Sequence, residues 1–106
     1  MNTSIITERG FYIITLDGDL DASSALQLDT EIKKALEQNE KKIVIDCSKL
    51  NYVSSSGLGV FISYLSDFEK DKIYFALLHV KDKIINTLNI LGLTKLLNII
   101  EKLPNV

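Results

Sequence analysis

The sequence has few of the residues that form disulfides, break secondary structure or bind metals in small proteins. Among its 106 residues there are one cysteine, one proline and one histidine. The single cysteine, Cys47, has no partner for an internal disulfide, which fits a reducing compartment such as the cytoplasm. The single proline, Pro104, leaves no proline-rich linker to divide the chain. Because 46% of the residues are hydrophobic, a core can form without disulfides or metals, and we expect one domain over residues 1–106.

A large charge of one sign is also missing, and so is a long hydrophobic run. The chain has 12 lysines and arginines against 14 aspartates and glutamates, so no broad basic surface is expected to hold nucleic acid or an anionic membrane. Polar residues interrupt every apolar stretch before the roughly 20 residues that span a bilayer. Residues 1–4 lack the basic and then apolar pattern of a secretion signal. We therefore expect a cytoplasmic protein that neither binds nucleic acid nor inserts into a membrane.

The amino-terminal part of the chain predicts a β-hairpin followed by a helix. Two β-rich runs, residues 5–7 and 11–16, flank a short turn whose glycine can adopt a positive φ. The second run should end at residues 17–19, where two aspartates surround a glycine. Apolar residues then recur at helical spacing over residues 21–38, which predicts an amphipathic helix with Asp21 as its N-cap.

A buried strand and a second helix come next. Residues 43–45 are β-branched without alternation, which suits a central strand covered on both faces. Apolar residues at helical spacing then predict a helix that begins in the serine cluster Ser54-Ser55-Ser56 and ends before Lys70. Residues 73–78 are apolar and predict a further strand.

The last part of the chain predicts a third helix and a short final element. Asp82 should cap this helix, and Gly92 should lie just past its end. Residues 96–100 fit either a helical turn or a final strand. The whole order predicts an α/β domain with a central mixed sheet of about four strands and helices mainly on one face, because strand–helix–strand units join parallel neighbours while the hairpin is antiparallel.

The serine cluster occupies a position that is suited to binding or carrying an anionic group. It lies beyond the carboxyl end of a predicted strand and at the start of a helix, where unpaired N–H groups and the helix dipole favour an anion. A phosphate added there would bring about 1.5 to 2 negative charges to the surface. One serine suffices to cap a helix, and an ordinary cap is the simplest explanation of the cluster. Three in succession exceed that need.

Two separated motifs resemble those of a known family. The run Ile43-Val44-Ile45-Asp46-Cys47-Ser48, followed by Tyr52-Val53-Ser54-Ser55-Ser56-Gly57-Leu58-Gly59-Val60, is similar to the signature of STAS-domain anti-sigma factor antagonists. In that family an Asp/Ser-Ser-Ser/Ala-Gly-Leu-Gly segment opens a helix, and Ser54 stands here where many members have an acidic residue. Gly18-Asp19-Leu20-Asp21 resembles a second family element, Gly-x-Leu/Ile-Asp. The resemblance implies a STAS domain over residues 1–106.

The resemblance also implies a regulatory function. Unphosphorylated members of the family bind an anti-sigma factor that is often also a serine kinase, and they thereby release a bacterial sigma factor for transcription. The kinase breaks the complex by phosphorylating the antagonist, and a PP2C-type phosphatase reverses the modification. The family's acceptor corresponds to Ser55, with Ser56 and Ser54 as fallback sites. The implied partner-binding surface consists of Asp21, Ser54, Ser55, Ser56, Gly57 and Leu58.

Other functions have less support in the residues. The main alternative is a non-switching STAS module, a structural or ligand-sensing subunit of a lipid-transport or stressosome-like assembly. Catalysis by Ser55 would need His79 as its base, and Val53 stands where a G-x-S-x-G elbow has glycine. Asp46 lacks the acidic pair of a receiver domain, and Cys47 has no neighbouring Cys or His. We expect no catalytic residue, metal site or cofactor.

Overall fold

The computed structural model describes residues 1–105, which begin with an antiparallel hairpin. β1 (Asn2–Glu8) is joined to β2 (Phe11–Leu20) by Arg9 and Gly10, and both have positive φ, 50° and 84°, as in the tight turns that match strand twist. This confirms the predicted hairpin. The expectation that the second strand ends at residues 17–19 is wrong, because β2 remains paired with a neighbouring strand as far as Leu20.

Helices and strands alternate after the hairpin. In chain order they are α1 (Ala22–Glu37), β3 (Lys42–Val53), α2 (Ser55–Lys70), β4 (Tyr74–Leu78), α3 (Asp82–Ile90) and β5 (Ile99–Ile100). The strands form one five-stranded sheet in the order β1-β2-β3-β4-β5. Only the β1–β2 pair is antiparallel among the described residues. The sheet is therefore mixed with β3 at its centre, as predicted, and β5 adds a fifth strand from the segment that fitted either a turn or a strand.

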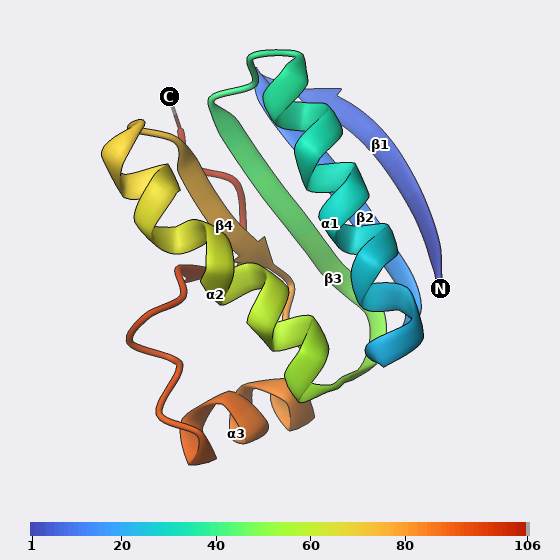
Figure 1. Ribbon diagram of the computed structural model, residues 1–106. Coiled ribbons are helices and arrows are strands. Elements are labelled where there is room, and N and C mark those ends of the chain that lie inside the picture. The colour runs from blue at the N-terminus through green and yellow to red at the C-terminus, as the bar shows by residue number, and fades with distance from the viewer. Residues whose placement is uncertain (106) are drawn as a thin grey trace.

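The two long helices cover one face of the sheet. Figure 1 shows α1 and α2 side by side in front of the strands, with α3 near the start of α2. Their apolar stripes join the strands in one core cluster, to which α1 contributes Leu28 and Ile32 and α2 contributes Phe61. A smaller cluster lies on the opposite face and includes Leu103 of the C-terminal segment. The prediction of helices mainly on one face is confirmed.

β3 is much longer than its sequence suggests. The β-branched residues 43–45 predicted the strand, but β3 has 12 residues in all, from Lys42 to Val53, so residues 48–53 also belong to it. Leu50 and Val53 are buried, and they pair with Gly18 and Leu20 of β2. Two register shifts along this pairing break the alternation that normally identifies a half-buried strand. The extension carries the end of β3 to the start of α2.

The helix ends agree only partly with expectation. α2 ends at Lys70, one residue later than predicted, and Gly92 lies just past α3 with a φ of 72°. Asp82 is not the cap of α3, because it is the first helical residue and Lys81 holds the cap position without a side-chain cap hydrogen bond. None of the helices within residues 1–105 is long and apolar enough to cross a membrane.

Candidate functional site

The two segments singled out in the sequence meet at the carboxyl ends of β2 and β3. Leu20 and Val53 are the last register partners of these parallel strands. The next residues, Asp21 and Ser54, therefore start their helices side by side. The backbone N–H of Ser54 donates to the carbonyl of Leu20 over 2.8 Å, which ties the two helix starts together.

Asp21 caps α1, as predicted. Its Oδ1 accepts from the backbone N–H of Ser24 at 3.0 Å and from the Ser23 hydroxyl at 2.7 Å. The Ser24 hydroxyl in turn accepts from the Asp21 N–H at 2.9 Å, which completes a capping box. These hydrogen bonds, that from Ser23 foremost, hold the pKa of the Asp21 carboxyl below its usual value. Asp21 thus presents a fixed negative charge beside the serine cluster.

The three serines of the cluster have different roles. Ser54 is the N-cap of α2, and its Oγ accepts from the Gly57 N–H at 3.1 Å. The prediction that this helix begins within the serine cluster is therefore confirmed. Ser55 and Ser56 are the first two helical residues, and both are exposed. Within residues 1–105 neither hydroxyl forms a hydrogen bond with the protein, whereas the Ser54 hydroxyl oxygen accepts the cap bond.

Gly57 allows the start of α2 to approach β2. A Cβ at this position would lie 2.5 Å from Leu20 Cγ and 3.2 Å from the Leu20 carbonyl oxygen. Leu20 is completely buried and cannot move aside. Gly59, two residues further along the helix, faces open space, since nothing lies within 4 Å of a Cβ built there. The first glycine of the motif therefore serves close packing. Leu58, the last of the predicted partner-binding residues, is buried beside it.

A pocket of about 320 Å³ opens next to Ser55. It lies between the end of β3, the start of α2 and α3, and its lining is Asn51, Tyr52, Val53, Ser54, Ser55, Leu58, Lys83, Ile84, Thr87 and Leu91. At its margin, Lys81 Nζ donates to Asn51 Oδ1 over 2.8 Å. The contribution of α3 to this pocket was not predicted. Lys81 and Lys83 are typical of a solvent-exposed helix start, and no local sequence pattern shows against which part of the sheet α3 packs.

The other chemically reactive side chains lie apart from the cluster. His79 and Asp46 line a different pocket, together with Leu103 of the C-terminal segment, so His79 is not placed as a base for Ser55. Cys47 is buried, and burial, with a smaller effect of the Asp46 charge, raises its pKa to about 12. Among residues 1–105 no three histidine, cysteine, aspartate or glutamate side chains gather where they could hold a metal ion.

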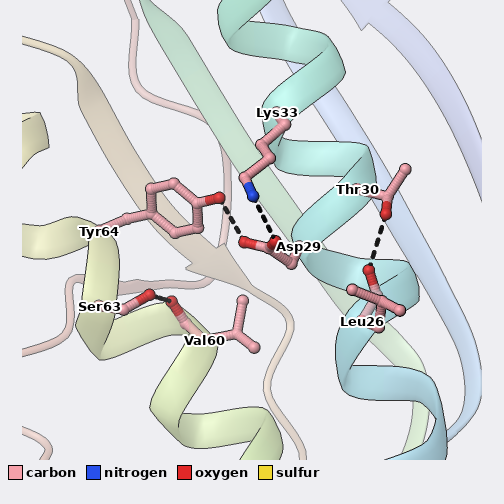
Figure 2. A network of polar contacts seen from close by, with 7 residues as sticks. All are labelled: Leu26, Asp29, Thr30, Lys33, Val60, Ser63 and Tyr64. Carbon is pink, nitrogen blue, oxygen red and sulfur yellow. Dashed lines mark hydrogen bonds and ion pairs between the residues drawn. The ribbon is translucent and has the colours of Figure 1, made fainter.

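A polar brace connects the two helices that carry the site. The Tyr64 hydroxyl of α2 donates to Asp29 Oδ1 of α1, and Lys33 Nζ lies 3.0 Å from Asp29 Oδ2 (Figure 2). The bond from Tyr64 foremost, and then Lys33, lowers the pKa of Asp29. Burial, with the Asp29 contact second, raises the pKa of Tyr64. The brace therefore links α1 to α2, the two helices whose N-terminal ends carry Asp21 and Ser55.

Comparison with known proteins identifies this arrangement. A family model described as the STAS domain matches residues 2–105. The chain belongs to the STAS domain family. This STAS domain is 25% identical over 101 residues to an anti-sigma-B factor antagonist of Staphylococcus aureus, a match that covers 95% of this chain and 94% of that protein.

Solved structures share the fold of this STAS domain. An anti-sigma factor antagonist from Mycobacterium paratuberculosis superimposes with a TM-score of 0.84 at 20% identity, covering 96% of this chain and 86% of that one. The Bacillus cell fate determinant SpoIIAA, in its phosphorylated form, superimposes with a TM-score of 0.70 at 20% identity, covering 95% and 93%. The predicted α/β STAS architecture is confirmed by these matches.

Proposed function

We propose that this STAS domain is an anti-sigma factor antagonist that works by partner switching in the bacterial cytoplasm. In this proposal the unphosphorylated protein binds an anti-sigma factor with serine kinase activity, and phosphorylation of Ser55 releases it. A PP2C-type phosphatase restores the binding form. The protein acts by binding and carries out no catalysis itself. The observation that carries the proposal is the exposed Ser55 hydroxyl, which forms no hydrogen bond within residues 1–105 and begins α2 beside Asp21.

A phosphate at Ser55 would alter the surface and leave the fold intact. Ser54 already supplies the cap of α2, so modification of Ser55 breaks no hydrogen bond of the helix start. The free N–H groups and the dipole of the first turn favour the added negative charge. On the surface the same charge opposes an acidic or apolar partner through repulsion and desolvation. Ser56 has the same exposure one position on, which makes it the first fallback site.

The serine at position 54 is compatible with such a switch. Aspartate and serine are both strong N-caps, so either residue starts the helix before the acceptor. Ser54 keeps this function through its bond from the Gly57 N–H. What it lacks is a carboxylate next to Ser55, and the kinase would then recognise other parts of this surface. Asp21, the N-cap of the neighbouring helix, still supplies a negative charge beside the start of α2.

The proposal can be tested with three variants of Ser55 and its helix. Tagged wild type, Ser55→Ala, Ser55→Asp and Ser66→Asp are used to capture proteins from the native host, followed by mass spectrometry. We expect wild type, Ser55→Ala and the Ser66→Asp control to retain an ATPase of the histidine-kinase type, and Ser55→Asp to lose it. Ser66 is a suitable control because it is exposed on the same helix at its other end.

The captured factor then decides the site of modification. We expect incubation with ATP to place one phosphate on Ser55, located by tandem mass spectrometry, and calorimetry to show weaker binding of the phosphorylated form. Equal affinity of Ser55→Asp and wild type would refute the switch. A bound lipid, or a transport component in place of the ATPase, would favour the non-switching alternative.

A further inference from the structure

The pocket beside Ser55 combines buried apolar walls with an exposed apolar mouth. Leu58 of α2 and Ile84 of α3 are buried, with 4% and 6% of their surfaces exposed. Tyr52 and Leu91, which also line the pocket, are 54% and 53% exposed. Large apolar side chains gathered around a hollow are typical of protein-binding surfaces, where an anchoring side chain of the partner fills the hollow.

The charge at the rim of the pocket is positive. Lys83 is the only charged residue in its lining, and it takes part in no ion pair within residues 1–105. Lys81 adds a second positive charge at the margin through its bond to Asn51. Asp82 stands between the two lysines in the sequence but does not line the pocket. A segment with acidic residues would complement this rim.

We propose that the pocket receives an apolar side chain from an acidic segment of the anti-sigma factor. This inference rests on the function proposed above and adds the chemistry by which the partner is recognised. The volume, about 320 Å³, is at the lower end of the range of roughly 300 to 1,000 Å³ for small-molecule sites. It suits a single anchoring side chain, with Tyr52 and Leu91 covering the flanks of that anchor and Lys83 facing its acidic neighbours.

The location of the pocket connects anchoring with phosphorylation. Ser55 and Lys83 line the same pocket from opposite helices. A phosphate on Ser55 would repel the acidic segment and attract the free ammonium group of Lys83. One modification would therefore remove the positive charge that attracts the partner and place a negative charge at the mouth of the apolar pocket. This explains how a change at one exposed serine can release a partner held mainly by apolar contact.

Calorimetric titration with the anti-sigma factor recovered by wild type tests the pocket. Leu91→Asp is compared with Leu96→Asp, because Leu96 is a similarly exposed leucine, at 57%, that does not line the pocket. We expect Leu91→Asp to weaken binding by about tenfold or more, because it removes apolar contact with the partner's anchoring side chain and places a negative charge beside the acidic segment. We expect Leu96→Asp to stay within about twofold of wild type, the usual range for an unrelated surface site.

The charge of the rim is tested in the same way. Lys83→Glu is compared with Lys95→Glu, an exposed lysine outside the pocket. We expect Lys83→Glu to weaken binding and Lys95→Glu to leave it unchanged. The difference in affinity between Lys83→Glu and wild type should shrink as salt is raised from about 0.05 to 0.5 M, because salt screens exposed charges. Leu91→Ala, which creates no new charge, provides a milder version of the anchor test. Circular dichroism and thermal melting establish that each variant is folded.

The outcomes separate this proposal from the proposed function. If Leu91→Asp and Leu91→Ala bind like wild type while Ser55→Asp does not, the pocket is not the anchor site and the switch stands. Equal losses for Leu96→Asp and Leu91→Asp would also overturn the pocket. If wild type captures no such factor, the function and the pocket fall together.

Discussion

Gly57 of α2 lies directly against the Leu20 side chain of β2, closer than any residue with a Cβ could lie. Leu20 immediately precedes Asp21, and Gly57 follows the serine cluster by one residue. This contact therefore sets the distance between the two halves of the candidate site. It also gives the glycine of the motif a physical reason that is independent of phosphorylation.

Gly57→Ala should destabilise the protein by about 1 to 3 kcal/mol, the usual cost of overpacking a well-filled core. The added Cβ would meet Leu20 Cγ at 2.5 Å, and neither the buried side chain nor the strand backbone behind it can yield easily. Urea unfolding followed by circular dichroism measures the change. Gly59→Ala is the matched control: its Cβ meets nothing within 4 Å, and replacing a helical glycine should stabilise by up to about 1 kcal/mol. Similar effects at both positions would contradict the packing argument.

Because Ser54 caps α2 and Ser56 does not, the two serines should differ in their effect on stability when each is replaced by alanine. Ser54→Ala removes the oxygen that accepts from the Gly57 N–H, so it should lower the free energy of unfolding by about 1 kcal/mol. Ser56→Ala should leave stability unchanged or raise it by a few tenths of a kcal/mol, because Ser56 is exposed in the helix and alanine is the better helix former. Urea titration of both variants decides the point. A larger loss for Ser56→Ala than for Ser54→Ala would place the cap elsewhere.

The helices and the buried strand starts could be predicted because their patterns are local. Apolar residues at helical spacing identify α1 and α2, and the β-branched run at residues 43–45 identifies the centre of the sheet. Asp21 was recognisable as a cap for the same reason: the capping box is made within four residues. The motif likewise placed Ser55 at a helix start, although not the exact residue that caps it.

The rest of the site depends on contacts between distant segments. The extension of β3 to Val53 follows from pairing with β2 across two register shifts, which leave no alternation to read in either strand. Ser54 is the cap because it directly follows the end of β3 at Val53 and precedes the first helical residue, Ser55. Lys83 and Leu91 join the pocket through the packing of α3 beside the start of α2, and no spacing in the sequence specifies that packing.

The brace between α1 and α2 predicts how stability changes with pH. The folded-state pKa of Asp29 is lowered, so its contribution is present above the unfolded pKa of roughly 4 and is lost as pH falls through the folded value. Tyr64 has a raised folded pKa, so its contribution is lost as pH rises above roughly 10. Tyr64→Phe should therefore lower stability by about 1 to 2 kcal/mol at pH 7 and flatten both arms of the pH profile.

Urea unfolding across pH 2 to 11, at intervals of about one unit, measures this profile. Tyr52→Phe is the matched control, because Tyr52 is 54% exposed and its hydroxyl forms no hydrogen bond within residues 1–105. The control should follow the wild-type curve throughout. If the Tyr64→Phe curve runs parallel to wild type below pH 4, the brace does not account for the acid sensitivity that we assign to it.

Cys47 should be chemically silent while the protein is folded. It is 1% exposed at the centre of the sheet, and its pKa of about 12 leaves almost no thiolate at neutral pH. A disulfide reagent at pH 8 should react with the native protein on the order of a thousandfold more slowly than with the protein in concentrated urea, because reaction requires opening of the core at a cost of about 4 kcal/mol or more. The absorbance of the released thiol follows both reactions. Labelling within the mixing time would mean that β3 opens readily. The end of β3, which Ser54 and Ser55 directly follow, would then not be a rigid support for the start of α2.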